Sequence, residues 1–505
     1  MTRLNQTSIE HARAGAVVYH RRSTALGQSP SPGVVHLGLG GFHRAHQAMV
    51  FDALIAQGDH RWGICAVGMR SDKLTRVLAQ QDHLYLVRRA DQTGATWHAP
   101  SSIVKTLVAA TERAAVVEQI ASADTRWITL TVTEKAYTEV LAQLIVDGLA
   151  LRHQHQRAPL TIVSCDNLPD NGHVLRALCL AQAQQMTDQP GLRSWIEGQC
   201  RFPCSMVDGI VPAPSPEVRQ AGIDDLGLDD PTALGVETFW EWVIEDTLVD
   251  PSDAQALRTV GVAFTDDVSG YEQAKLWMLN GSHTVLACAG AVLGDRFVRE
   301  VMARPVLRQF IHGYMTHATG PLVGRPQWQT YRDTLLERFA NPMVDHAVLQ
   351  ILTDTSAKIP VRWVPVGQAW LKREPRPASP SAARDGLAYL AMAVALFVRS
   401  LESRTETGQA FVFNDPLATE LQAAAKDQRT DPSAVMMRLL RSIEPTPTET
   451  VSTDENSAIF GQVFGQVLGQ NPAFVQACTH WLERIHALGI EAALTTFLQA
   501  PVSRP

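Results

Sequence analysis

A short apolar run leads directly into a glycine-rich turn, and this feature constrains the fold of the chain more than any other. The run is Val34–Leu37, the turn is Gly38-Leu-Gly40-Gly41, and a helical stretch follows to about Gln57. Further apolar runs that read as strands, with helical segments between them, lie at 62–67, 127–132 and 160–164. Strands that alternate with helices predict an α/β fold with a parallel sheet covered by helices.

The pattern changes near residue 266, where long helical segments begin to dominate. We expect helices at 271–294, 297–318, 329–339, 343–353, 384–403, 416–425, 432–442 and 471–500. A chain of 505 residues is too long for one hydrophobic core. We therefore predict a first domain over residues 1–265, which begins with an irregular arm at 1–32, and a mostly α-helical second domain over residues 266–505.

The composition argues against several classes of protein. With 44 Lys and Arg against 51 Asp and Glu, the formal net charge is −7, whereas proteins that bind nucleic acid usually carry a basic face. No secretory leader is expected, because the first thirty residues are polar. The longest apolar stretch, Gly386–Val398, is too short to span a bilayer. The seven cysteines are scattered without zinc-like spacing, so we expect a cytoplasmic protein with reduced thiols and no metal.

A strand, a Gly-x-Gly turn and a helix are the arrangement that binds the phosphates of a dinucleotide. In that role Gly38 allows the tight turn and Gly40 lets the backbone approach the pyrophosphate. The third glycine of the motif is replaced by His43. The pattern by itself is therefore equally compatible with an ordinary tight turn.

The residues beyond the second predicted strand bear on the choice of cofactor. Asp72 could accept the ribose hydroxyls of NAD, whereas Arg70 with Ser71 would suit the 2′-phosphate of NADP. All three residues also read simply as the start of a helix. We favour NAD and leave NADP open.

The run Lys275-Leu-Trp-Met-Leu-Asn280-Gly-Ser-His283 places an amine, an amide and an imidazole within nine residues, on what reads as a helix ending near Gly281. At about 100° per residue, Lys275 and His283 lie roughly 80° apart, with Glu272 between them and Asn280 roughly 60° beyond. All four therefore project from one side. A desolvated lysine can act as a base near neutral pH, and an amide can hold a developing oxyanion. The alternative is a lysine on the solvated face of an amphipathic helix.

Six sequence blocks occur in the order found in one family of enzymes. The blocks are His36–His46, Thr131–Tyr137, Ser164–Gly172, Phe202–Asp208, Trp242–Asp246 and Lys275–His283. On these motifs the chain resembles the polyol-specific long-chain dehydrogenases, the mannitol dehydrogenase family. The resemblance implies an N-terminal Rossmann-type, doubly wound domain, a mostly α-helical C-terminal substrate domain, and an active site between them. It also implies nicotinamide dependence, here NAD, without a catalytic zinc.

The resemblance assigns the catalytic roles by motif. It implies that Lys275 is the general acid/base and that Glu272 lies on the path by which this lysine exchanges its proton with solvent. Asn171 and Asn280 would polarise the carbonyl oxygen or hold the alkoxide. A removed oxyanion amide would lower the rate by about 10²–10³, or about 3–4 kcal/mol.

The resemblance also implies how cofactor and substrate are held. His283 and Asp208 would bind substrate hydroxyls, and Lys358 matches a lysine on the substrate side. The residues expected to bind the cofactor are Gly38, Gly40, Phe42, Asp72, Thr133 and Glu134. Asn171 and Asp208 each have a plainer interpretation as turn or cap residues, because a glycine follows each of them.

The chain departs from the family pattern at two positions. Ala136 stands where the family usually has glycine, which matters only if that position needs positive φ. Gly209 stands where the family commonly has arginine after the Val-Asp pair. The loss of that charge affects substrate preference more than chemistry.

Two details favour the uronate branch of the family. Cys204 replaces an asparagine of the polyol enzymes, and Gln350 stands where those enzymes can carry arginine. The implied reaction converts D-fructuronate and NADH to D-mannonate and NAD, and Lys358 or Arg362 could bind the substrate carboxylate. The main alternative is oxidation of a neutral polyol such as mannitol or arabinitol.

The expected partner is thus a small sugar acid or polyol, with no nucleic acid and no membrane. A non-catalytic, nucleotide-binding relative is the other hypothesis, although a sensor would not need the set formed by Lys275, Asn171, Asn280 and His283. The resemblance is compatible with a monomer or a homodimer.

Overall fold

A computed structural model describes residues 2–12, 17–19, 30–373, 385–440, 463 and 467–501. The chain divides into two compact units, Met1–Ser269 and Gly270–Pro505, and each is described by itself. Part of the predicted arm and the outer ends of the helices predicted at 384–403 and 432–442 lie outside the described residues.

The first unit is built around a five-stranded sheet with the order β7-β4-β3-β8-β9. Its strands are β3 (Val34–Leu37), β4 (Ile64–Gly68), β7 (Ile103–Val108), β8 (Trp127–Leu130) and β9 (Thr161–Ser164). All four strand pairings are parallel. The strand order runs outward from β3 in both directions, and an open α/β sheet binds its ligand at such a reversal. The predicted Rossmann-type, doubly wound α/β domain is confirmed.

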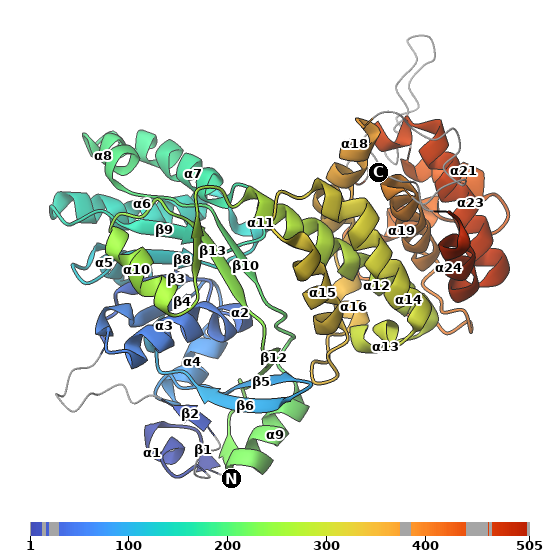
Figure 1. Ribbon diagram of the computed structural model, residues 1–505. Helices are drawn as coiled ribbons and strands as arrows, with labels where there is room; N and C mark the ends of the chain where they lie inside the picture. Colours follow the sequence, from blue (N-terminus) through green and yellow to red (C-terminus); the bar gives the residue numbers. More distant parts are fainter. Residues whose placement is uncertain are drawn as a thin grey trace. The chain divides into compact units, whose positions relative to one another are not determined.

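Alternate residues of the central strands enter two separate hydrophobic cores. Val34 and Ile64 lie in one core, and Val35 and Cys65 lie in the other, because successive side chains of a strand point to opposite faces. The first core is covered by α3 (Gln47–Ala56) and α10 (Pro251–Thr259). The second core (Figure 1) is covered by α5 (Arg113–Ala121), α6 (Glu139–Gln154), α7 (Asn171–Gln185) and α8 (Leu192–Gln199).

Besides the two-stranded pair β1 (Thr2–Arg3) and β11 (Leu228–Asp229), two smaller sheets belong to the described part of this unit, and none of the three was predicted. One contains β10 (Ser205–Asp208), β13 (Glu241–Glu245) and β14 (Ala263–Thr265). The other contains β2 (Val17–Tyr19), β5 (Val87–Asp91), β6 (Gly94–Ala99) and β12 (Leu234–Glu237). The remaining helices are α2 (Gly41–Ala45), α4 (Lys73–Ala79) and α9 (Pro216–Leu226).

The prediction of an irregular arm over 1–32 is wrong for the described part of that segment. β1 (Thr2–Arg3) pairs with β11 (Leu228–Asp229), and β2 pairs with β6. In the sequence between β1 and β2 lies the helix α1 (Gln6–Ile9), which is capped by the Asn5 side chain. These elements form because Leu4 and Ile9 enter a third hydrophobic core, and two apolar residues are too few to show a periodic pattern.

The second unit is helical, as predicted. Its helices begin with α11 (Ser269–Gln273), η3 (Ala274–Asn280), α12 (Gly281–Leu293), α13 (Val298–Met302), α14 (Pro305–Gly313), η4 (Tyr314–Thr319) and α15 (Trp328–Phe339). They continue with α16 (Val348–Leu352), α17 (Thr355–Arg362), α18 (Val364–Leu371), α19 (Gly386–Ser400), α20 (Ala418–Ala424), α21 (Pro432–Leu440), α23 (Pro472–Leu488) and α24 (Ile490–Gln499). Helices α12 and α19 pack against each other and are apolar around nearly their whole circumference, as central helices of a core are.

Four predicted helical segments differ in extent. The segment at 343–353 is helical only over α16, the segment at 297–318 breaks before Pro305, and the segment at 471–500 is interrupted at Gly489. Pro305 has no N–H for the helical hydrogen bond to the preceding turn, and Gly489 has φ of 81°. The helix predicted at 271–294 spans Ser269–Leu293, so the end that was expected near Gly281 does not occur.

One helix among the described residues, Ser269–Leu293, is long and apolar enough by length and composition to cross a membrane. Of its apolar window, 78% is buried inside the structure, as is also found for the central helix of a folded domain. All seven cysteines lie in the described part of the chain, and each is a buried thiol that forms no disulfide.

Candidate active site

The turn Gly38–Gly41 follows the carboxyl end of β3. Gly38 has φ of 100°, and a Cβ there would lie 2.3 Å from the carbonyl oxygen of Thr131, just beyond β8. Only glycine fits this close approach. At Gly40 a Cβ would meet only the carbonyl oxygen of Gly38, at 3.7 Å, so the backbone is open to an incoming group. A pyrophosphate fits this open turn at the start of α2.

The carboxylate of Asp166, just beyond β9, organises the loop that follows β8. It accepts hydrogen bonds from the backbone N–H of Thr133 at 2.8 Å, from that of Val132 at 3.1 Å and from the Tyr137 hydroxyl at 3.0 Å. Thr133 has φ of 72° and an exposed side chain. This predicted cofactor residue is therefore held rigidly at the carboxyl end of the sheet. Asp166 was not singled out, although it lies in one of the family blocks.

The rest of this loop answers one question raised by the sequence. Ala136 lies in the 3-10 turn η2 (Glu134–Ala136) and has no positive φ. The alanine at this position is therefore free of the strain that a required glycine would imply. The side chain of Glu134 lies outside the described residues.

Asp72 lies beyond the end of β4, at the start of α4. Its exposed carboxylate pairs with Arg76, and this hydrogen bond lowers the pKa of Asp72 below its usual range. The carboxylate is ionised at neutral pH and reachable from solvent. To bind the ribose hydroxyls of the cofactor, Asp72 would have to break its exposed ion pair with Arg76. This contact with the cofactor remains a prediction.

Two histidines stack behind the glycine-rich turn. The rings of His36 and His43 lie 3.3 Å apart, at an interplanar angle of 10°, and both are fully buried. The nitrogens of His36 bond the hydroxyls of Thr129 at 2.9 Å and Thr131 at 3.0 Å. Desolvation lowers the pKa of His36 to about 3 and lowers that of His43 well below its usual value. Both rings are therefore neutral and serve the packing of this turn.

Two other predicted site residues, Phe42 and Asp208, lie on segments that approach His46. Half-buried Phe42 stacks on the His46 ring with centroids 5.0 Å apart. Asp208 is buried at the end of β10, in register with Glu241 of β13. A Cβ added at Gly209 would lie 3.6 Å from the His46 ring. The side chain of an arginine at this position, which the family commonly has, would therefore start next to that ring.

Asn171 is fully engaged inside the first unit. Its amide nitrogen donates to the carbonyl oxygens of Ser205 at 2.8 Å and Asp166 at 3.1 Å, and its amide oxygen accepts from the N–H of Ser205 at 3.0 Å. A primary amide has two N–H donors. The predicted oxyanion contact of Asn171 would therefore require the release of one of these backbone carbonyls.

Lys275 lies in η3, which is a π-helix and not the α-helix assumed from the spacing. The 100° rotation used to place Glu272, Lys275, Asn280 and His283 on one side does not hold through this segment, because π-helical bonds span five residues. Single π-helical turns are rare in proteins overall, but those that occur lie frequently at functional sites. Lys275 is half-buried, and Asn280 and His283 are buried.

The junction of η3 with α12 is held by side chains from α17 and its end. The guanidinium of Arg362 donates to the carbonyl oxygen of Asn280 at 3.1 Å and to the hydroxyl of Thr284 at 2.9 Å. The Trp363 indole donates to the carbonyl oxygen of Gly281 at 3.2 Å. These donors stabilise carbonyl groups at the place where the helical register changes. Arg362, predicted to bind a carboxylate, thus also positions the helix that carries Lys275.

His283 lies among cations. Its pKa is well below the usual value, first because of burial and further because of His346, Arg362, Arg338 and Lys358. Its ring lies 4.5 Å from that of Phe339 and meets the ring of His346 edge-on at 5.0 Å. Its Nε2 atom has no hydrogen-bond partner among the described residues. A neutral imidazole with an unused nitrogen suits a substrate hydroxyl. His346 and Arg338 were not among the predicted site residues, because no sequence motif points to them.

Lys358 is held at the end of a neighbouring helix. Its ammonium group donates to the carbonyl oxygens of Ile351, at 2.9 Å, and Thr353, at the carboxyl end of α16. Cations are stabilised at that end of a helix. These two bonds fix the ammonium group at the end of α16.

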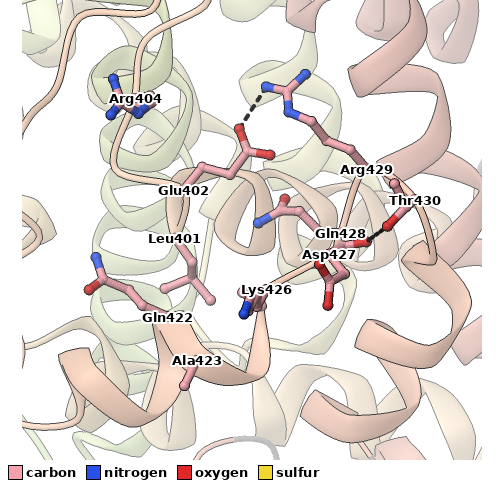
Figure 2. Close-up of a pocket in the computed structure, with 11 residues that line it drawn as sticks. Leu401, Glu402, Arg404, Gln422, Ala423, Lys426, Asp427, Gln428, Arg429 and Thr430 are labelled. Atoms are coloured by element: carbon pink, nitrogen blue, oxygen red, sulfur yellow. Dashed lines mark hydrogen bonds and ion pairs between the residues drawn. The ribbon is translucent and has the colours of Figure 1, made fainter.

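A separate hollow of about 740 Å³ lies in the second unit and contains none of the predicted site residues. In Figure 2, Arg429 reaches across it to Glu402, at 2.7 Å. Glu402 also pairs with Arg399, at 3.0 Å. The hollow also presents Arg404, Lys426 and Asp427, so its charges are mixed, and we assign no ligand to it.

Comparison with family models now decides the relationship. Residues 32–255 match the mannitol dehydrogenase Rossmann domain, and residues 267–440 match the mannitol dehydrogenase C-terminal domain. The chain belongs to the mannitol dehydrogenase family. It is therefore an oxidoreductase of a family that acts on CH–OH groups, as the sequence blocks indicated.

Individual relatives carry two kinds of name. The chain is 32% identical over 506 residues to mannitol 2-dehydrogenase of Cereibacter sphaeroides, covering 93% of this chain and 97% of that one. It is 33% identical over 421 residues to D-mannonate oxidoreductase of Escherichia coli, covering 77% and 84%. Among solved structures, Pseudomonas fluorescens mannitol 2-dehydrogenase in a ternary complex with NAD and D-mannitol matches with a TM-score of 0.81, 29% identity, and 99% and 100% coverage.

Proposed function

We propose that the chain is an NAD(H)-dependent oxidoreductase that converts D-fructuronate to D-mannonate. The observation that supports an acidic substrate is the positive charge around His283, contributed by Arg338, Lys358 and Arg362. A carboxylate is attracted into such a cluster, and an uncharged polyol is not. The relative named D-mannonate oxidoreductase supports the same substrate.

The proposed cofactor is NAD. The open backbone at Gly40 and the close packing of Gly38 fit a pyrophosphate, and Thr133 and Glu134 would lie on the nicotinamide side. Asp72 would accept the ribose hydroxyls. The nicotinamide, when bound, supplies or accepts the hydride.

Proton transfer is assigned to Lys275. In the direction of reduction, the protonated lysine donates to the carbonyl oxygen while the amide of Asn280 stabilises the charge that develops there. Asn171 adds a second amide donor after it releases one backbone carbonyl. Glu272, in the preceding helical turn, passes the replacement proton from solvent. Oxidation follows the same path in reverse.

Substrate hydroxyls are assigned to His283 and Asp208. Since the pKa of His283 lies well below neutral pH, its neutral ring can donate or accept one hydrogen bond at Nε2. The carboxylate of the substrate would then pair with the positive charge of Lys358 or Arg362. No zinc is needed in this scheme, because the lysine and the amides perform the roles of acid and oxyanion stabiliser.

Oxidation of a neutral polyol is the second candidate function. The relative named mannitol 2-dehydrogenase covers more of the chain than the mannonate enzyme does. Cys204 and Gln350 argue for the uronate branch, but Gln350 is exposed and touches no predicted site residue in any described hydrogen bond. The polyol reaction therefore belongs in the same test.

The test is a substrate screen that follows NADH absorbance. NADH and NADPH would each be combined with fructuronate, tagaturonate and fructose, and NAD with mannonate, mannitol and arabinitol. We expect activity with fructuronate and mannonate and a preference for NADH. Turnover confined to mannitol or arabinitol would overturn the sugar-acid assignment.

Lys275→Ala tests catalysis against the alternative of a non-catalytic, nucleotide-binding relative. Cofactor binding, measured by NADH fluorescence, should persist while turnover falls by orders of magnitude. Unchanged turnover would contradict the assignment of the lysine. We further propose a cytoplasmic location and a monomeric or homodimeric state, which fractionation and light scattering would check.

A further inference from the structure

Three potential metal ligands from two segments of the first unit converge beside Asn171. They are the carboxylate of Asp170, a ring nitrogen of His173 and the thiol of Cys204, and these atoms all lie within 4.8 Å of one another. Asp170 and His173 are exposed, whereas Cys204 is 1% exposed. No reaction step assigned above uses any of the three.

The backbone around this cluster is held in place from both sides. A Cβ at Gly172 would lie 2.4 Å from the carbonyl oxygen of Phe202, so the start of α7 is pressed against the segment that leads to Cys204. The N–H of Cys204 donates to the carboxylate of Glu245 at 2.8 Å. The paired bonds between Asn171 and Ser205 join the same two segments. The thiol is therefore fixed, and the two exposed side chains can turn toward it.

The donor set selects a class of cation. One oxygen, one nitrogen and one sulfur donor suit a borderline metal ion such as Zn²⁺ or Co²⁺ and disfavour Mg²⁺ and Ca²⁺, which prefer oxygen alone. Tetrahedral zinc with ligands at about 2.0–2.3 Å places those ligands about 3.5 Å apart. The present separations reach up to 4.8 Å, so the exposed side chains of Asp170 and His173 would turn toward the thiol on binding.

We propose that Asp170, His173 and Cys204 form a binding site for one Zn²⁺ or Co²⁺ ion, with a fourth position open to water. Binding releases the thiol proton of Cys204 to solvent and forms a metal–thiolate bond. The bound ion ties the start of α7 to the segment before β10. Asn171 lies between Asp170 and His173 in the sequence, so the ion would bind next to this residue. The site is distinct from the proposed reaction, which uses no metal.

Cobalt absorption tests the site without any turnover. Untagged, full-length protein freed of metal would be titrated with CoCl₂, and a thiolate-to-cobalt charge-transfer band should rise to saturation at one ion per chain. ZnCl₂ should then abolish the band by displacing the cobalt. Cys204→Ser should remove the band, and His173→Ala should weaken cobalt binding by at least tenfold.

Two controls keep the result interpretable. His155→Ala removes an exposed histidine outside the cluster and should leave the titration unchanged. Circular dichroism would confirm that each variant is folded. A wild-type protein without the charge-transfer band, or a band that survives in Cys204→Ser, would overturn the proposal. Either result leaves the proposed reductase activity untouched, because that activity is measured by NADH oxidation.

Discussion

Arg362 offers the sharpest test of how the structure positions Lys275. In Arg362→Met the guanidinium is lost, and with it the bonds to the Asn280 carbonyl at 3.1 Å and to the Thr284 hydroxyl at 2.9 Å. The Asn280 carbonyl keeps its bond from the Thr284 hydroxyl, at 3.0 Å, so no buried acceptor is stranded. The variant should therefore fold, with a loosened junction between η3 and α12.

The expected loss of stability at this junction follows from the two lost hydrogen bonds, and the fall in kcat follows from the displacement that this loss permits. Each hydrogen bond from a charged donor contributes about 1.5–3 kcal/mol, and because Arg362 is half-buried the lower end applies, or about 3 kcal/mol for both. A displacement of about 1 Å at a reacting group lowers the rate about 10²-fold. We expect kcat to fall about 10²-fold, which corresponds to about 2.7 kcal/mol at 1.36 kcal/mol per tenfold change.

Steady-state kinetics separates positioning from substrate binding. A positioning residue lowers kcat for every substrate that is turned over and shifts the pH profile of kcat, whereas a carboxylate partner raises KM for the sugar acid alone. Arg362→Lys should restore part of kcat, because an ammonium group can reach one of the two acceptors. Arg338→Met is the matched control, since it also removes a cation near His283. An increase in KM with unchanged kcat in Arg362→Met would refute the positioning role.

Three further changes test other parts of the structure. Gly38→Ala should abolish NADH binding, measured by fluorescence titration, because the added Cβ would meet a backbone oxygen at 2.3 Å. The control is Gly58→Ala, where φ is 96° and nothing lies within 4 Å of the added Cβ. This variant should retain NADH binding and lose only a little stability. Because burial lowers the pKa of His36 to about 3 in the folded protein from its ordinary value of 6.5, unfolded chains take up its proton first as pH falls. Stability in urea should thus decrease below pH 6.5, by about 1.4 kcal/mol per pH unit for this group, and His36→Gln should flatten the decrease. Glu402→Gln should lower the unfolding free energy by about 3 kcal/mol in thermal melts, because Arg399, 4% exposed, loses its partner; an unchanged melting temperature would contradict this.

The parallel sheet was predictable because its cause is local. Val34 and Val35 belong to a continuous apolar run, and a strand buried on both faces must be apolar at every position. The glycine-rich turn was predictable for the same reason, since the positive φ of Gly38 is a property of one residue. The small strands near the chain start were not, because β1 has no apolar residue, β2 is only three residues long, and their partners lie far along the sequence.

The sequence yields a candidate set of site residues but not their contacts. Motifs suggest Lys275 and Asn171, and the need of an acidic substrate for a cation suggests Arg362. Spacing could not reveal that the amide of Asn171 is bonded to the backbone or that Arg362 supports a helix junction. Both facts depend on segments more than thirty residues away in the sequence. Periodicity also assumes an α-helix, and so it misplaced the residues of η3.

Because η3 (Ala274–Asn280) is a π-helix, the number of residues in this short segment should matter for function. A π-helical loop holds one residue more than an α-helical loop, so deletion of one residue within Ala274–Asn280 would let the chain regularise into a continuous α-helix. The altered protein would keep its apolar surface and its fold, yet Lys275 and His283 would face different directions. Insertions and deletions here should therefore be far less tolerated than substitutions, and any redesign of substrate range would do well to keep this segment at its present length.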